Sequence, residues 1–263
     1  MVRCDIITLF PDMVVPVLGQ SMLKRAQEKG LLEVRVWNLR DFTLDRHQIA
    51  DDVPYGGGGG MVLKAEPVFR AVDALREEYR EAISGSQLRL LLMSPQGRPL
   101  SEAFARELRD DGRRLVFLCG HYEGIDERVQ VGLDPEEVSL GDYVLTGGEL
   151  PALVIIDAVA RLIPGVLGDP DSPLHDSFAQ TVLDHPQYTR PAEVRGLEVP
   201  EVLLSGDHEA IRRWRRKEAL RNTYQKRPDL LKGRALNDED QRLLEEVVQE
   251  ADRNATVAEL GGG

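Results

Sequence analysis

The sequence lacks an apolar run long enough to cross a membrane. Its longest candidate, residues 150–167, is interrupted by Asp157, Arg161 and Pro164, whereas a spanning helix needs about 20 predominantly apolar residues. Residues 1–8 carry no long apolar run and no small-residue cleavage site, so we expect no signal peptide. Both absences predict a protein without a membrane partner.

Cysteine is scarce as well, because the 263 residues include only Cys4 and Cys119. Two thiols cannot build the disulfide framework of a small secreted domain. Both lie in apolar, strand-like runs, where a free cysteine behaves as a small core residue. We therefore expect two reduced thiols, without a redox or metal-binding role, in a cytoplasmic protein.

A third deficit is positive charge. Lys and Arg number 33 against 45 Asp and Glu, a formal net charge of −12, whereas nucleic-acid-binding domains usually carry net positive charge. The balance is uneven, however, because residues 207–236 sum to +6 and residues 237–263 to −6. Arg212, Arg215 and Arg216 are spaced to share one helical face. That face is either a phosphate-contact surface or a solvated surface paired with the acidic C-terminal residues, and this segment alone favours neither.

The glycine motifs of nucleotide-binding loops are absent, although glycines are clustered. Residues 55–61 read YGGGGGM, which is neither a P-loop, with Gly-Lys before Ser or Thr, nor a dinucleotide fingerprint, with Gly at i, i+2 and i+5. This argues against a nucleotide hydrolase. The run is either a flexible loop or a place where the backbone approaches a ligand closely.

The sequence does contain short apolar runs that alternate with helix-like stretches. Such alternation is typical of an α/β domain with a mainly parallel sheet and flanking helices. The predicted strands are Val2–Thr8, Glu33–Leu39, Leu88–Met93 and Leu115–Cys119, and the predicted helices are Met13–Glu28, Ala65–Glu81, Ser101–Asp110 and Pro151–Ile163.

The texture of the chain changes at Pro164. Residues 164–191 contain five prolines and two glycines, which is typical of a linker or loop, and the chain beyond Pro200 has a helical pattern to about Asp252. We therefore expect an α/β domain over residues 1–166, an interdomain linker or lid loop over 167–185, and a small C-terminal helical domain over 186–263.

Three glycine-bearing segments lie at the ends of strands and have the character of a binding site. They are residues 93–97 (MSPQG), 120–128 (GHYEGIDER) and 139–150 (SLGDYVLTGGEL). Turn chemistry explains each one alone. In open α/β sheets, however, ligands gather at the carboxyl ends of the strands. The three segments together predict one cleft, whose backbone groups and open space suit a flat ring such as adenine.

The chain resembles a known family in several long strings. It is similar to the bacterial tRNA (guanine-N1)-methyltransferases, the TrmD family of the SPOUT superfamily, in ITLFPDM, DDVPYGGGGGMV, SPQG, CGHYEGIDER, SLGDYVLTGGELPALVIIDAVARLIPGVLG, DSF, YTRP and VLLSGDHEAIRRWRR. The resemblance covers most of the chain. It implies a sheet tied into a deep trefoil knot, S-adenosylmethionine as cofactor, and a homodimer with its active site between subunits.

The resemblance also implies the reaction, which is methylation of N1 of the guanine at tRNA position 37, 3′ of the anticodon. Asp176 would be the general base and Arg161 would stabilise charge on O6, because N1 carries a proton that must leave as the methyl group arrives. Asp184 would help to place the guanine. The family is associated with Mg²⁺, and Glu123 or Asp176 would lie near such an ion, although two carboxylates do not establish a site.

Further roles follow from the same resemblance. The C-terminal domain would grip tRNA, so the phosphate-contact interpretation of Arg212, Arg215 and Arg216 gains weight. The implied cofactor-binding residues are Leu92, Met93, Pro95, Gly120, Tyr122, Glu123, Gly124, Leu140, Gly141, Tyr143, Leu145, Gly147 and Gly148.

Two alternatives stay open. A knotted methyltransferase that acts on another RNA would not need a base suited to N1, and the loop that carries Asp176 argues against it. A non-catalytic RNA-binding protein would keep the basic segment but would have no reason for three cofactor loops.

Overall fold

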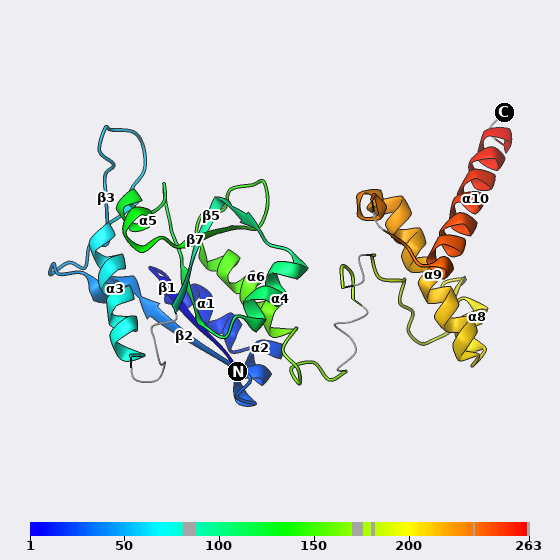
Figure 1. The fold of residues 1–263 in the computed structure, drawn as a ribbon, viewed down its shortest axis with the longest axis horizontal. Coiled ribbons are helices and arrows are strands. Elements are labelled where there is room, and N and C mark those ends of the chain that lie inside the picture. Colours follow the sequence, from blue (N-terminus) through cyan, green and yellow to red (C-terminus); the bar gives the residue numbers. More distant parts are fainter. Residues whose placement is uncertain (81–87, 170–175, 180–181, 234, 262–263) are drawn as a thin grey trace. The chain divides into compact units, whose positions relative to one another are not determined.

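The computed structural model describes the chain except for residues 81–87, 170–175, 180–181, 234 and 262–263 (Figure 1). The chain divides into two compact units, Met1–Pro170 and Asp171–Gly263, and each is described by itself. The division falls inside the segment 167–185 that the sequence predicts as a linker.

The first unit is built on a five-stranded sheet. Its strands lie in the order β2-β1-β6-β5-β7, and every neighbouring pair is parallel. The predicted α/β class with a mainly parallel sheet is therefore confirmed. The strands are β1 (Val2–Thr8), β2 (Leu32–Asn38), β5 (Leu88–Pro99), β6 (Arg114–Leu118) and β7 (Glu136–Ser139).

Helices cover both faces of this sheet. Alternate residues of a strand point to opposite faces, and on β1 Cys4 and Ile6 belong to one buried apolar cluster while Ile7 belongs to another. Both cysteines are free and buried, as predicted. The first cluster includes residues of α1 (Pro11–Leu18), α2 (Ser21–Glu28), α4 (Glu102–Asp110) and α6 (Glu149–Ala160), and the second includes residues of η1 (Leu39–Phe42), α3 (Ala65–Glu78) and α5 (Glu127–Leu133).

Some predicted elements differ from the structure. The prediction of a single helix over residues 13–28 is wrong, because Ser21 has a φ of 49°, which interrupts the helical run and separates α1 from α2. The sequence pattern also misses α5 and β7. The seven residues of α5 and the strand EEVS are too short and too polar to show an apolar period.

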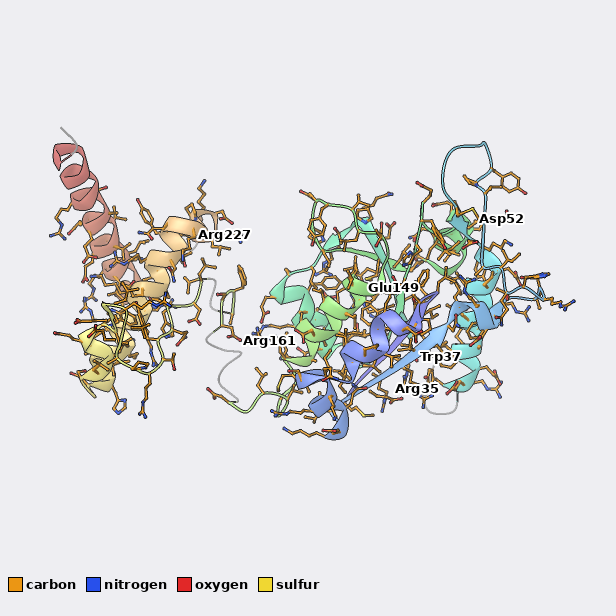
Figure 2. All side chains as sticks on the ribbon, turned by 180° about the vertical axis from the view of Figure 1, so that it is seen from behind. Arg35, Trp37, Asp52, Glu149, Arg161 and Arg227 are labelled. Atoms are coloured by element: carbon orange, nitrogen blue, oxygen red, sulfur yellow. The ribbon has the colours of Figure 1, made fainter. Side chains whose placement is uncertain are left out.

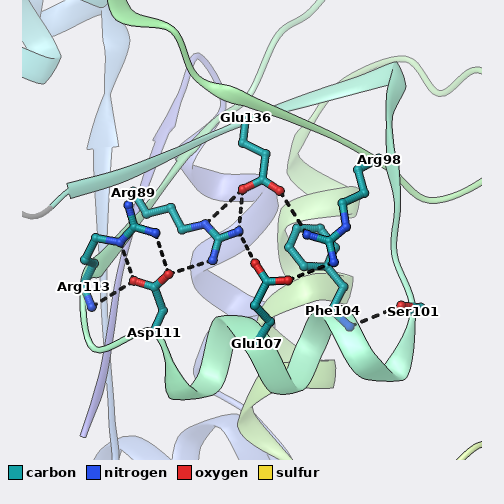
Figure 3. A network of polar contacts seen from close by, with 8 residues as sticks. All are labelled: Arg89, Arg98, Ser101, Phe104, Glu107, Asp111, Arg113 and Glu136. Atoms are coloured by element: carbon teal, nitrogen blue, oxygen red, sulfur yellow. Dashed lines mark hydrogen bonds and ion pairs between the residues drawn. The ribbon is translucent and has the colours of Figure 1, made fainter.

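A network of ion pairs ties the edge of the sheet to α4 (Figure 3). Arg89 on β5 is only 7% exposed, and its guanidinium donates to Glu136 on β7, to Glu107 on α4 at 2.6 Å and to Asp111 at 2.7 Å. Arg113 donates to the same Asp111 at 2.5 and 2.7 Å. The network therefore holds β5 beside β7, and both strands lead into predicted cleft segments.

The second unit is mainly helical. Its elements are β8 (Glu193–Val194), β9 (Leu197–Glu198), α8 (Glu201–Leu204), α9 (His208–Lys226), η2 (Pro228–Leu231) and α10 (Asp238–Gly261). The side chain of Asp207 caps α9 by accepting hydrogen bonds from the backbone N–H groups of Glu209 and Ala210. Leu220 on α9 and Leu243 on α10 share a small buried core with Val182, a residue of the segment that the sequence predicts as a linker.

Within the described ranges, no helix is both long and apolar enough to span a bilayer.

Candidate functional site

A cavity of about 480 Å³ lies at the ends of β6 and β7 and beside the irregular part of β5, where the pairing with β7 shifts register between Met93 and Arg98. The predicted strand end at Met93 is therefore wrong, because β5 resumes its pairing with β7 and continues to Pro99. The walls of the cavity come from residues 92–96, from 120–130, and from 137–151 with some gaps. These are the three glycine-bearing segments of the sequence, extended by a few residues. The structure thus brings all three to one place at the carboxyl edge of a parallel sheet, where ligands of such sheets bind.

Twelve of the thirteen residues that the resemblance implies for the cofactor line this cavity. Gly141 is the exception, because its backbone forms a tight turn in the wall: its N–H donates to Ser139 Oγ at 3.1 Å and its carbonyl accepts from Tyr143 N at 2.9 Å. The twelve lining residues are Leu92, Met93, Pro95, Gly120, Tyr122, Glu123, Gly124, Leu140, Tyr143, Leu145, Gly147 and Gly148.

Gly148 allows two of the segments to touch. Its N–H donates to the carbonyl of Gly120 at 2.9 Å, and a Cβ at Gly148 would lie 2.7 Å from the Cα of Cys119. Only glycine fits so close to another backbone. The segment after β6 and the segment before α6 therefore form one continuous wall of the cavity.

The glycine run is attached to the rim of the same cavity. It connects β3 (Asp51–Asp52) to β4 (Val62–Leu63), and Leu63 N donates to the Gly124 carbonyl while Glu123 N donates to the Met61 carbonyl, both at 3.0 Å. At Gly60, with a φ of 83°, a Cβ would lie 2.3 Å from the Glu123 carboxylate. One end of the run thus packs closely against the Glu123 side chain in the cavity wall.

Two side chains, one at the cavity rim and one buried behind it, bear on the chemistry of the site. Tyr122 is about half exposed, and partial burial together with the Asp51 carboxylate raises its pKa, so its phenol stays protonated at neutral pH. Cys119 is fully buried, and burial with the nearby Glu149 carboxylate raises the pKa of its thiol well above the ordinary value. Cys119 is therefore a packing residue rather than a nucleophile.

Sequence reasoning misses a buried polar chain next to the cavity, which links Thr8, Glu149 and His121. Figure 2 labels Glu149 among the side chains of the first unit. Glu149 has no exposed surface, and its two oxygens lie 2.5 Å from Thr8 Oγ1 and 2.9 Å from His121 Nε2. Thr8 and Glu149 stand 141 residues apart in the chain. No local signal announces such a contact; only the segment GHYEG hints at His121.

The implied catalytic residues belong to different units. Arg161 is half-buried and follows α6 in the first unit, where its N–H donates to the Asp157 carbonyl. Asp176 is half-buried and belongs to the second unit, where its carbonyl accepts from Ala179 N at 3.1 Å. The positions of Arg161 and Asp176 are therefore described separately, each within its own unit.

Asp184 lies in a segment that is attached to α9. Leu183 N donates to Thr223 Oγ1 at 2.9 Å, and Asn222 Nδ2 donates to the Asp184 carbonyl at 2.8 Å. Asp184 N in turn donates to Ser177 Oγ at 2.9 Å. These three hydrogen bonds connect the neighbourhood of Asp176 to a helix. Residues 170–175 and 180–181 of the predicted lid lie outside the described part of the chain.

The three arginines implied for tRNA have different surroundings. Arg212 donates to Glu209 and Glu239, each at 2.7 Å, and Arg216 forms a two-pronged pair with Asp240. Arg215 is exposed, and within the described residues no ion pair is recorded for it. For Arg212 and Arg216 the structure gives the pairing that the alternative interpretation describes, a basic face matched by acidic C-terminal residues.

The described residues contain no group of three or more His, Cys, Asp or Glu side chains that could hold a metal ion. Glu123 is the exposed carboxylate on the cavity rim among the implied site residues.

Comparison with known proteins identifies the relatives of this chain. A family model described as tRNA (Guanine-1)-methyltransferase TrmD matches residues 2–233. The tRNA (guanine-N(1)-)-methyltransferase of Dictyoglomus turgidum is 54% identical over 250 residues, which cover 95% of this chain and 98% of the relative. Those of Moorella thermoacetica and Limosilactobacillus fermentum are 53% and 49% identical, over 93% and 96% of this chain and 96% and 99% of the relatives.

Proposed function

Because the chain belongs to the tRNA (guanine-N1)-methyltransferase family, we propose how its residues transfer a methyl group from S-adenosylmethionine to N1 of a tRNA guanine. The proposal assigns the cofactor to the cavity beside β5 and the ends of β6 and β7, and the target to guanine 37, 3′ of the anticodon. We place this reaction in the cytoplasm.

The single observation that carries the cofactor assignment is the convergence of the three glycine-bearing segments on one cavity. Exposed backbone N–H and C=O groups can recognise the edge of adenine, and the glycines of the lining keep such groups accessible. The resemblance further implies that these segments form a deep trefoil knot. S-adenosylmethionine, when bound, supplies the electrophilic methyl group.

The chain's own residues would handle the proton and the charge. Asp176 would accept the N1 proton of guanine, so that N1 can take the methyl group that S-adenosylmethionine would supply, with S-adenosylhomocysteine as the leaving group. Negative charge develops toward O6, where the guanidinium of Arg161 stabilises it. Asp184 helps to orient the base.

A homodimer would bring these groups together between subunits. The first unit supports this proposal with an apolar surface on two helices that contact each other, α1 and α6. Met13 and Val17 on α1 are 40% and 47% exposed, and Leu150 and Val154 on α6 are 50% and 47% exposed. Each pair is spaced i, i+4, so each forms one stripe on its helix, and apolar stripes of this kind mark association surfaces.

The different surroundings of the three arginines support different roles for them in tRNA binding. We assign a phosphate contact to Arg215, which is exposed. Contacts from Arg212 and Arg216 would first require their carboxylate pairs to open. At the rim of the cavity, the Glu123 carboxylate would supply one ligand to a Mg²⁺ ion. Since the ion prefers six oxygen ligands, water or phosphate would have to supply the others.

The test is methyl transfer to two tRNA transcripts that differ only in guanine or adenine at position 37, followed by identification of the product nucleoside. We expect 1-methylguanosine from the first transcript and no product from the second. Asp176→Asn should reduce the rate by at least about a hundredfold, in the range of a lost general base, and should leave cofactor binding intact. Transfer at the wild-type rate by a folded Asp176→Asn protein would exclude Asp176 as the base.

A further inference from the structure

Glu149 is an unusual residue to find without any exposed surface. It is the first residue of α6, next to Gly147 and Gly148 of the cavity wall, and its side chain points away from solvent. A buried carboxylate is strongly destabilising unless its oxygens are hydrogen-bonded. The contacts that compensate for the burial of Glu149 beside the cavity are therefore informative.

Both oxygens of Glu149 have one partner each. Oε1 accepts from Thr8 Oγ1 at 2.5 Å, and Thr8 Oγ1 itself accepts from Phe10 N at 2.8 Å. Oε2 lies 2.9 Å from His121 Nε2. The first turn of α6 adds the favourable field of a helix N-terminus. The carboxylate therefore links the end of β1, the start of α6 and the segment after β6.

His121 transmits this link to the cavity wall. Its ring lies 4.5 Å from the ring of Phe10 and 5.8 Å from that of Tyr122, measured between centroids. Its carbonyl accepts from Gly124 N at 3.0 Å, which closes the turn that contains Tyr122 at a φ of 58°. A shift of His121 would therefore move the turn.

Gly147 shows how tightly the chain of contacts is built. A Cβ at this position would lie 2.2 Å from His121 Nε2 and 2.5 Å from Glu149 Oε2. The absence of a side chain at Gly147 is thus required for the contact between His121 and Glu149, and His121 and Gly147 also form an isolated β-bridge. Two cavity-lining segments meet at this one carboxylate.

We propose that Glu149, acting through His121, is a positioning residue that fixes the turn 120–124 in the conformation that receives the adenosyl group of S-adenosylmethionine. This inference rests on the proposed assignment of the cofactor to the cavity. Glu149 is buried behind the cavity wall and does not line the cavity, so its loss should weaken cofactor binding and leave the chemical step nearly unchanged at saturating cofactor.

The same strand supplies a matched control. Asp5 is also fully buried on β1 and accepts hydrogen bonds from Trp37 at 2.7 Å and from Tyr79 and Arg114 at 3.0 Å. None of these four residues lines the cavity. Asp5→Asn therefore perturbs a buried carboxylate of the same unit away from the cofactor.

The experiment measures binding of S-adenosylmethionine by calorimetry on the full chain without tRNA, together with KM, kcat and thermal stability. Glu149→Leu should weaken binding and raise KM for the cofactor by about tenfold or more, with kcat within about twofold, because small displacements of positioning groups are that consequential. Glu149→Gln can still accept from Thr8 and donate to His121, so it should recover most of the affinity. Asp5→Asn should lower thermal stability with cofactor affinity unchanged.

A second variant keeps the test decisive if Glu149→Leu fails to fold. His121→Phe keeps a ring against Phe10 and removes the contact with Glu149, and it should show the same loss of cofactor affinity. The inference is overturned if the folded Glu149→Leu or His121→Phe protein binds S-adenosylmethionine like the wild type, or if Asp5→Asn weakens binding equally. If the wild-type protein itself does not bind the cofactor, the cavity assignment falls, and this inference falls with it.

Discussion

Arg216 on α9 and Asp240 on α10 form a two-pronged ion pair, in which Nε and Nη2 of the arginine donate to the two carboxylate oxygens at 2.7 and 2.6 Å. Asp240 is 4% exposed, and pairing with it raises the pKa of Arg216 further. Two-pronged pairs of this kind are among the stronger hydrogen-bonded contacts in proteins. The pair therefore stabilises the packing of α9 against α10.

This relationship predicts opposite effects for two neighbouring arginines. Arg216→Ala should lower the free energy of unfolding by about 1–3 kcal/mol, because it leaves the buried Asp240 carboxylate without its cation. Arg215→Ala should leave stability nearly unchanged, weaken tRNA binding and reduce the slope of log affinity against log salt concentration by about 1. Denaturant titration and tRNA binding at several salt concentrations measure the two effects. Equal losses of tRNA affinity with equal stability would contradict this division.

A second prediction concerns the segment next to Asp176. Thr223 has no exposed surface, and its Oγ1 accepts from Leu183 N, so Thr223→Val would remove the acceptor while keeping the shape of the side chain. Asn222→Ala would remove the donor to the Asp184 carbonyl. If the segment positions the general base, each variant should lower kcat by about tenfold or more, and cofactor binding should stay unchanged.

The control for that experiment lies one turn along the same helix. Lys226 Nζ donates to Asn222 Oδ1 at 3.0 Å, so Lys226→Ala removes the other contact of Asn222 without touching the segment. We expect its kcat to match the wild type. A Lys226→Ala protein as slow as Asn222→Ala would point to α9 itself rather than to the attached segment.

Strands of the fold could be predicted from the sequence where burial on both faces gives a continuous apolar run. The predicted strand Val2–Thr8 has the same bounds as β1, because this central strand is covered by helices on both faces. The edge strand β7 could not be found, because two of its four residues are glutamates. One of these, Glu136, pairs with Arg89, which stands 47 residues earlier in the chain.

The candidate site, like the fold, was predictable from the sequence only in part. The glycine-bearing segments could be found because each follows or precedes an element with a clear pattern, and parallel strands bring their carboxyl ends to one edge. The chain from Thr8 through Glu149 to His121 could not be found, since it depends on side chains that meet only after the sheet has formed. The ion pairs of Arg212 and Arg216 with α10 illustrate the same limit: the charges were visible in the sequence, and their partners were not.

A third prediction uses the acid sensitivity of the network around Arg89 (Figure 3). Hydrogen bonds from Arg113 and Arg89 lower the pKa of Asp111 to about 2, from an ordinary value of 3.8. Since the pKa is lower in the folded protein than in the unfolded chain, the stabilisation is fully present above about pH 4 and is lost as the pH falls toward 2. Asp111→Asn should therefore lower the free energy of unfolding by about 2 kcal/mol at pH 7. The difference from the wild type should disappear near pH 2, and a difference that persisted unchanged there would rule out the ionised carboxylate as its source.

The last prediction concerns the apolar stripes on α1 and α6. If they form the surface between two subunits, Val154→Glu should place a charge in that surface and convert a dimer to a monomer, since burying an unpaired carboxylate opposes association by several kcal/mol. The proposed active site needs both subunits, so methyl transfer should fall in parallel. Val131→Glu is the matched control, because Val131 is 79% exposed on α5, which covers the opposite face of the sheet. Light scattering at several protein concentrations should show a monomer for Val154→Glu and a dimer for Val131→Glu. If both variants remain dimers with full activity, the subunit surface lies elsewhere on the molecule.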